Sequence, residues 1–230
     1  SEVIDLPSEG KLYPEGHPCK DGKIEIKYMT AKEEDILTSQ NLIKKGVVID
    51  RLLDSLILTP GIKSNDLLLG DKNAVMVASR ILAYGPEYEC SIQNPDGEGS
   101  VDYTFNLADC PFKKLPKNVN ENNFEVELPI SKKKVCFKLL TGKEEEAILS
   151  DIKAHKKIGS LVSPDLTTRL RHSIISVDGD STGSTINQFV ENLLARDSMY
   201  LRQQMRDVTP DIELTQEIEI GGESVKVDIP

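Results

Sequence analysis

The residues best placed to carry chemistry lie in the acidic loop Asp178-Gly179-Asp180-Ser181-Thr182-Gly183. Two aspartates and a hydroxyl group could hold a divalent cation, but an EF-hand needs further oxygen ligands and a glutamate at its last position. Asp, Gly and Ser are also common turn-forming residues. The sequence therefore predicts a solvent-exposed turn. A metal-dependent hydrolase using Asp178, Asp180 and a distant histidine is a remote alternative.

The histidines and cysteines form no recognisable site. His155 lies among lysines near a predicted helix end, His172 follows two arginines, and His17 stands between Gly16 and Pro18. No G-x-S-x-G elbow, P-loop or G-x-G-x-x-G motif accompanies them. The spacing of the cysteines favours reduced thiols over a zinc site, since no C-x-x-C pair occurs. The four cysteines are Cys19, Cys90, Cys110 and Cys136. We therefore predict no catalytic residue, no cofactor and no metal.

Two segments have the composition of a binding surface for another protein. Residues 1–20 contain proline and glycine too densely for a helix, and they predict an extended arm with apolar side chains that can dock. Such an arm loses little entropy on ordering and can lie along a partner. A basic spot is predicted at lysines 132–134, with 113, 114 and 117, either as a charged hairpin tip or as a docking patch for an acidic partner. The candidate partner-binding residues are Leu6, Pro7, Leu12, Tyr13, Pro14, Lys132, Lys133 and Lys134.

Helical periodicity predicts about six helices to position these segments. Capping boxes at Thr30 with Glu33 and at Thr141 with Glu144 mark two of the helix starts. The longest apolar stripe runs from Ser184 to Val208, as one helix or as two with a corner near Asp197, and we expect it to be the central helix. The predicted helices cover residues 31–45, 47–58, 71–84, 141–158, 164–176 and 184–208.

Alternating apolar and polar residues predict strands between and around these helices. The expected strands are at 23–29, in hairpins at 87–93 with 100–106 and at 124–130 with 135–140, and in a C-terminal hairpin at 212–220 with 224–229. The predicted class is α+β: a helical core with an inserted antiparallel β segment of two hairpins and a C-terminal β-hairpin. The predicted segments are an arm and strand at 1–29, a helical half at 30–86, the β segment at 87–140, a second helical half at 141–209 that packs with the first, and the hairpin at 210–230.

The composition excludes several function classes. The chain has 230 residues and a net charge of −10, which argues against nucleic acid and anionic membranes as partners because both attract basic surfaces. No apolar run approaches the ~18 residues of a membrane span. The first residues have neither a basic start nor an apolar run, so no secretory signal is expected.

Several blocks of the sequence, in their order, resemble one family. They are Leu6 to Pro14 (LPSEGKLYP), Ile26 to Leu37 (IKYMTAKEEDIL), Ser79 to Gly85 (SRILAYG), Ser176 to Gly179 (SVDG), and Leu194 to Ser198 (LARDS) followed by Leu201-Arg202. Together these blocks are similar to baseplate hub proteins of T-even-type, contractile-tailed bacteriophages. The resemblance implies a structural or assembly role with no known cofactor. The family is expected to continue into an aromatic-rich end, which this sequence lacks.

The residues and the resemblance together favour a protein that is not an enzyme. We expect a structural or assembly component of the baseplate hub that acts by protein–protein binding in the virion, or in the host cytoplasm during assembly. The alternative is an assembly chaperone that is absent from the finished virion. The expected partners are other phage baseplate or tail proteins, with a homo-oligomer as a further alternative, and neither nucleic acid nor membrane.

Overall fold

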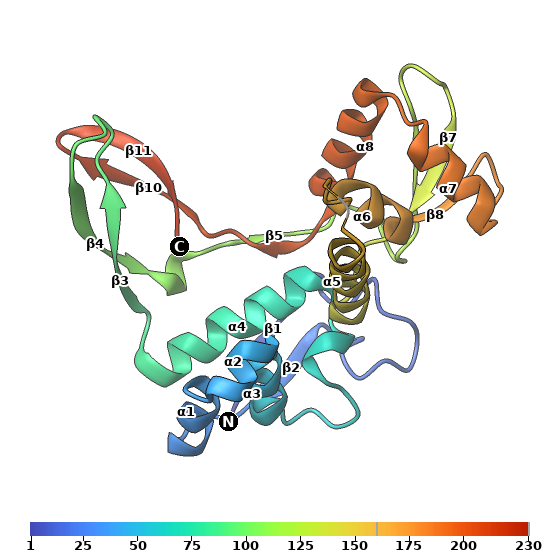
Figure 1. The fold of residues 1–230 in the computed structure, drawn as a ribbon. Coiled ribbons are helices and arrows are strands. Elements are labelled where there is room, and N and C mark those ends of the chain that lie inside the picture. Colours follow the sequence, from blue (N-terminus) through green and yellow to red (C-terminus); the bar gives the residue numbers. More distant parts are fainter. Residues whose placement is uncertain (160, 230) are drawn as a thin grey trace.

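The computed structural model describes residues 1–159 and 161–229, and this part of the chain has eight α-helices and several small antiparallel sheets. Figure 1 shows a V-shaped arrangement in which two arms rise from a helical base. The architecture confirms the predicted mixed α+β class. The prediction of six helices is too low, because the segments at 31–45 and 184–208 are each divided into two helices.

The base contains four helices that follow one another along the chain. Thr30 and Glu33 form the predicted capping box at the first of them. The predicted helix at 31–45 is interrupted because Thr38 ends one helix and Ser39 occupies the N-cap position of the next, a position that serine favours. The elements are α1 (Ala31–Leu37), α2 (Gln40–Lys45), α3 (Val48–Leu56), the 3-10 helix η1 (Ser64–Asp66) and α4 (Leu69–Tyr84).

The N-terminal segment folds back on the base, so the prediction of an extended arm is wrong. Strand β1 (Glu2–Asp5) pairs antiparallel with β2 (Lys23–Ile26), and the residues between them form consecutive turns. Gly10 has a positive φ of 75°, and a Cβ there would overlap the carbonyl oxygen of Lys20. The close turns bury the apolar side chains of this segment in the chain's own core, because burial removes their apolar surface from water.

One arm, which we call the hairpin arm, consists of two β-hairpins far apart in the sequence. The predicted hairpin of β3 (Glu87–Gln93) and β4 (Ser100–Asn106) is confirmed, as is the C-terminal hairpin of β10 (Thr215–Ile220) and β11 (Glu223–Asp228). The two hairpins face each other in Figure 1, and their apolar side chains share one core with the 3-10 helix η2 (Leu107–Asp109).

The other arm, the helical arm, contains the second predicted hairpin. The second hairpin is confirmed as β6 with β7, and a third strand from the helical region extends it in the order β6-β7-β8, so the two predicted hairpins belong to separate sheets. Strand β7 pairs on one side with β6 and on the other with β8. The strands are β6 (Phe124–Glu127), β7 (Lys134–Phe137) and β8 (Ile174–Val177).

The helices of this arm correct two further predictions. The helix expected at 164–176 ends at Ser173, because Ile174 and Val177 are buried as residues of β8. The segment at 184–208 turns a corner at residues 192–194, and it lies at the end of the arm, so it is not the central helix. The capping box at Thr141 and Glu144 is confirmed. The helices are α5 (Gly142–Lys157), α6 (Asp165–Ser173), α7 (Gly183–Glu191) and α8 (Ala195–Val208).

Helix α4 is the element that joins the parts. Its Val75 belongs to the main core, which unites the base and the helical arm, and its Val77 belongs to the core of the hairpin arm. The chain crosses between the arms in a short ladder of β5 (Phe112–Lys113) and β9 (Asp211–Ile212). This crossing runs directly over the start of α4, where a Cβ on Gly70 would overlap the carbonyl oxygen of Pro210. The two arms are therefore tied to the same helix.

Candidate interaction surface

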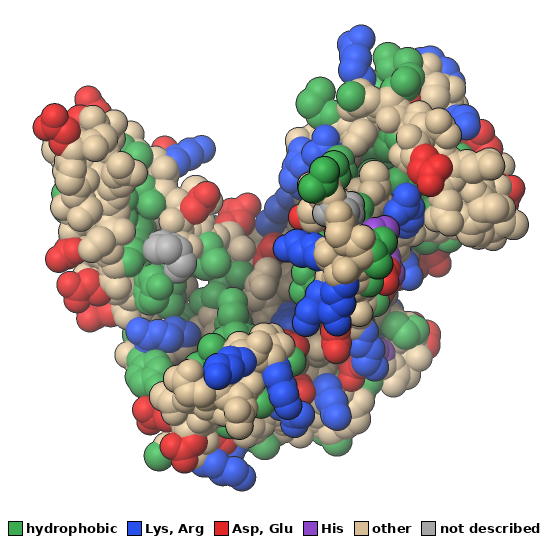
Figure 2. Space-filling view, in the orientation of Figure 1, with side chains coloured by type: hydrophobic (Ala, Val, Ile, Leu, Met, Phe, Trp, Pro, Cys, Tyr) green, Lys and Arg blue, Asp and Glu red, His purple; other side chains and the backbone are tan. Residues whose placement is uncertain are grey.

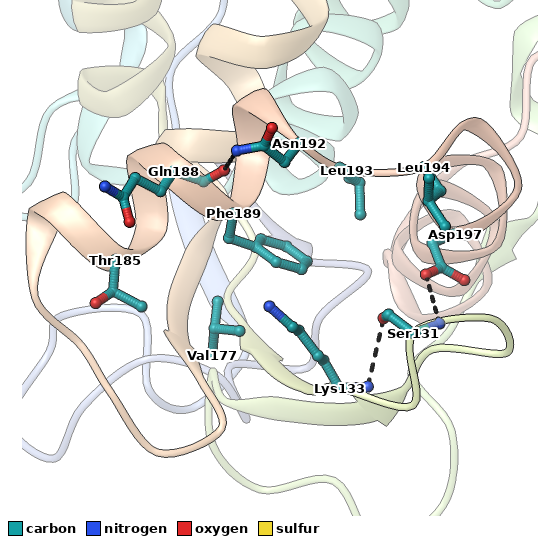
Figure 3. Close-up of a pocket in the computed structure, with 10 residues that line it drawn as sticks. All are labelled: Ser131, Lys133, Val177, Thr185, Gln188, Phe189, Asn192, Leu193, Leu194 and Asp197. Carbon is teal, nitrogen blue, oxygen red and sulfur yellow. Dashed lines mark hydrogen bonds between the residues drawn. The ribbon is translucent and has the colours of Figure 1, made fainter.

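A groove at the end of the helical arm is a candidate for binding (Figure 3). It has a volume of about 270 Å³ and lies between the tip of the β6–β7 hairpin and the corner where α7 gives way to α8. Lys133 extends over the floor of the groove, with its Nζ 5.7 Å from the ring centroid of Phe189. A cation at this distance is attracted by the face of the ring, so Phe189 holds the lysine over the groove.

The hairpin tip is fastened to α8 by one buried carboxylate. Asp197, in the first turn of α8, accepts hydrogen bonds from the backbone N–H groups of Ile130 at 2.9 Å and Ser131 at 3.0 Å. Burial by itself raises the pKa of the Asp197 carboxyl, but these N–H donors outweigh it and the pKa lies below its ordinary value. The carboxylate therefore stays charged and holds the lysine-bearing tip in place.

The composition of the groove suits binding and offers no chemistry. Its ionisable groups are Lys133 and Asp197, and the Asp197 carboxylate is already occupied by backbone donors. Polar side chains from α7, including Thr185 and Gln188, border an apolar floor. Leu194 at the corner is 52% exposed. Such a surface can accept an apolar side chain of another protein and hydrogen-bond its neighbours.

The predicted partner-binding residues do not lie together. Lys132, Lys133 and Lys134 are exposed at the hairpin tip, and Lys133 enters the groove. Pro14 is exposed in the N-terminal turns. The other four are buried in this chain, where they are inaccessible to a partner: Leu6, Pro7, Leu12 and Tyr13. For the exposed residues, contact with a partner stays a prediction.

The N-terminal turns are held by a buried polar network that sequence reasoning missed. Asp71 in the first turn of α4 accepts hydrogen bonds from the Ser8 N–H at 3.0 Å, the Ser8 hydroxyl at 2.6 Å and the Tyr13 hydroxyl at 2.7 Å. The Tyr13 oxygen in turn accepts the Leu68 N–H at 2.9 Å. Burial raises the pKa of Asp71, and the donors from Ser8 and Tyr13 offset this only in part. The network stabilises the fold, because every strong donor around the carboxylate has a partner.

The acidic loop is a structural turn, as predicted. Asp178 has a positive φ of 50°, and its carboxylate accepts the Lys134 N–H at 2.8 Å. Asp180 accepts the Thr182 N–H at 2.9 Å and the Thr185 hydroxyl at 2.7 Å, and the Thr182 N–H foremost lowers its pKa. Both carboxylates thus fix local backbone. In residues 1–159 and 161–229, no three His, Cys, Asp or Glu side chains converge as metal ligands.

The histidines and cysteines are also dispersed through the structure. His17 stacks on Tyr13 with ring centroids 4.2 Å apart, and His172 lies 3.1 Å from the Asp151 carboxylate across the α5–α6 contact. His155 lines a separate shallow groove beside His172. The cysteines have free thiols, and burial raises the pKa of Cys19 to about 12, so this thiol is inert at neutral pH.

Comparison with known proteins identifies the family. The chain matches the model of the family described as T4 bacteriophage base plate protein over residues 2–228. The chain belongs to this family. Membership confirms the resemblance to T-even phage proteins found in the sequence blocks. No curated protein and no solved structure matches this baseplate protein.

Membership in a baseplate family implies that the chain binds other phage proteins. In the part of this baseplate protein that the structure describes, no helix is long and apolar enough to cross a membrane. The sequence could identify the lysine tip as a binding candidate from its charge. It could not identify the groove, because Phe189 and Asp197 reach the tip only through the fold.

Proposed function

We propose that the chain is a structural or assembly component of the baseplate hub of a contractile-tailed phage, acting by protein–protein binding and without enzymatic activity. Its partners are other baseplate or tail proteins and further copies of the chain. The observation that carries the proposal is the family match over residues 2–228, supported by a groove whose ionisable groups are held in structural contacts.

The fastened hairpin tip supports a binding role. A partner that docks on a rigid surface pays little ordering entropy, and the Asp197 hydrogen bonds hold Lys133 beside Phe189 before any partner arrives. Two apolar side chains are partly exposed here in the described part of the chain: Leu194, which lines the groove, is 52% exposed, and Ile130, on the neighbouring hairpin tip, is 45% exposed. Together they form a site for the apolar contact of a neighbouring subunit.

The second candidate is an assembly chaperone that shields a partner until the partner is incorporated. A chaperone would bind its partner through the same exposed side chains. The two roles therefore differ only in whether the chain remains in the finished particle. Quantitative mass spectrometry of purified virions separates them. A permanent hub component gives a fixed copy number per virion, whereas a chaperone is present in infected-cell lysate and missing from virions.

The binding role is tested separately by the proteins that co-purify from infected cells. We expect Lys133→Glu and Leu194→Asp to lose baseplate proteins that the wild-type chain captures. Lys44→Glu is a matched control, since it reverses an exposed lysine of α2 that lies outside both the groove and the predicted basic spot. Capture that is unchanged by both groove variants would contradict the role of the groove. A bound cation lost in Asp178→Asn and Asp180→Asn would instead revive the hydrolase alternative.

A further inference from the structure

The net negative charge of the molecule is concentrated in the hairpin arm. Residues 87–109 and 214–229, which build the hairpin arm, contain ten acidic residues and the single basic residue Lys226. Their net charge of −9 accounts for nearly the whole net charge of −10 of the chain, and the remainder is nearly neutral. Figure 2 shows the acidic side chains gathered along the outer surface of this arm. The hairpin arm is therefore an acidic body attached to a neutral one.

Basic and exposed apolar side chains follow one another at the end of α5, in the helical arm. The last turn of α5 carries His155, Lys156 and Lys157. It is followed by Ile158, which is 79% exposed, and by Leu161, which is fully exposed. Residues 151–163 carry three Lys and one Asp. Exposed apolar side chains near cationic ones are typical of a docking site.

The hairpin arm has a receptor of matching character at its foot. A mostly apolar pocket of about 230 Å³ is lined by residues of α4, β3 and η2 and by the residues that flank the C-terminal hairpin, among them Met76, Leu214 and Ile229. Arg80 also lines the pocket, with its guanidinium 4.7 Å from the ring centroid of Tyr84. The buried Nη1 of Arg80 has no hydrogen-bond partner in the described chain. An unpaired buried donor is costly, and a carbonyl oxygen of a docked loop would satisfy it.

From these features we infer that the chain self-associates: the apolar loop after α5 of one copy docks in the Arg80 pocket of a second copy, with the lysines of α5 facing the acidic hairpins. The occupant is a second copy because this chain itself supplies both halves of a complementary pair, in charge and in polarity. The two patches lie on different arms with a cleft between them (Figures 1 and 2). Contact between unlike patches generates rings or open chains of subunits, or a two-fold pair with two such contacts.

The mass of the full chain in solution tests this inference. Sedimentation velocity at 0.1 M and 1 M salt should give a mass above that of the 25.5 kDa monomer at low salt and a lower mass at high salt. The reason is that the Debye length falls from about 10 Å to about 3 Å over this range. The substitutions Ile158→Ser and Leu161→Ser should abolish association at both salt concentrations. A monomer under all conditions overturns the inference.

Charge reversal shows which surfaces meet. The triple variant Lys153→Glu, Lys156→Glu and Lys157→Glu should weaken association about tenfold or more at low salt, because the reversed helix end repels the acidic arm. The triple variant Glu87→Lys, Glu89→Lys and Glu217→Lys should weaken association to a similar extent, because these glutamates are exposed on the outer faces of the hairpins. An equimolar mixture of the two variants should restore association, since each then finds an opposite charge on the other.

A matched control changes the same number of charges elsewhere. Lys32→Glu, Lys44→Glu and Lys45→Glu reverse three exposed lysines on α1 and α2, which contribute no residue to the Arg80 pocket or to the end of α5. Association equal to that of the wild type is expected. If this control weakens association as much as the α5 variant, or if the mixture of the two charge variants stays monomeric, the inference is wrong. Both outcomes are independent of virion composition, which tests the proposed hub function.

Discussion

Removing one hydroxyl group tests the buried network that holds the N-terminal turns to α4. In Tyr13→Phe the ring remains, with its stacking on His17, but two hydrogen bonds disappear: the one donated to Asp71 at 2.7 Å and the one accepted from the Leu68 N–H at 2.9 Å. A hydrogen bond to a charged group contributes about 1.5–3 kcal/mol and a neutral one about 0.5–1.5 kcal/mol. We therefore expect the free energy of unfolding to fall by about 2–4 kcal/mol.

This loss is a large part of the stability of an ordinary domain, which is about 5–15 kcal/mol. For a chain of this length each kcal/mol lowers Tm by about 2–4 °C, so the expected fall is about 4–16 °C. Urea denaturation followed by circular dichroism measures the change in free energy. Burial beside Asp71 raises the pKa of Tyr13, so the hydroxyl remains a donor throughout the usable pH range.

Tyr28→Phe is the matched control. The Tyr28 hydroxyl donates to Glu2 at 2.8 Å, but this side chain is 47% exposed and water replaces the lost partner. We expect a change of less than about 0.5 kcal/mol. A double-mutant cycle of Tyr13→Phe with Asp71→Asn should reveal coupling between the two side chains. Equal stability losses in the two tyrosine variants would refute the argument that the network stabilises this segment.

Three further results are expected. Asp197→Ala should lower the free energy of unfolding by about 1–3 kcal/mol and speed hydrogen exchange at the Ile130 and Ser131 amides, as NMR would detect; unchanged exchange would contradict the fastening of the tip. Gly70→Ala should destabilise the folded chain by about 3 kcal/mol or more, because its Cβ would overlap the Pro210 carbonyl oxygen of the crossing segment. The loss should appear as a lower soluble yield and a lower Tm. The pKa of the buried Glu33 is lowered foremost by Lys27. The Glu33 carboxylate therefore contributes stability above the pKa of an unfolded glutamate, and this contribution is lost as the pH falls. The urea midpoint should fall less between pH 7 and pH 3 in Glu33→Gln than in the wild type.

Elements encoded by neighbouring residues were predictable from the sequence. The capping box of Thr30 and Glu33 needs only residues three positions apart, and it begins α1 where expected. The β3–β4 hairpin follows from strict alternation on both sides of a turn rich in Asn, Pro and Gly, and its bounds agree with the prediction. In both cases the decisive interactions are local, so tertiary packing does not override them.

Elements decided by distant partners were not predictable. Ile174 and Val177 are spaced as on a helix face, but the free edge of β7 selects the strand. The apolar residues of the N-terminal turns were correctly expected to dock, but their partner is this chain, through a bond between Ser8 and Asp71 across 63 positions. The groove was not predictable for the same reason, since Lys133 and Phe189 come together only after β6, β7 and α7 have assembled. Sequence patterns identify apolar residues but not the surfaces that cover them.

The way the hairpin arm is assembled also affects synthesis of the protein. Phe105 and Leu107 lie in one core with Ile218 and Ile229, so the first hairpin leaves the ribosome more than a hundred residues before the part that covers it. Translation proceeds at about 5–20 residues per second, so for several seconds the nascent chain carries a bare apolar sheet. A product terminated before Thr215 never covers that sheet. We expect such a fragment to expose this apolar surface permanently, which makes it prone to aggregation.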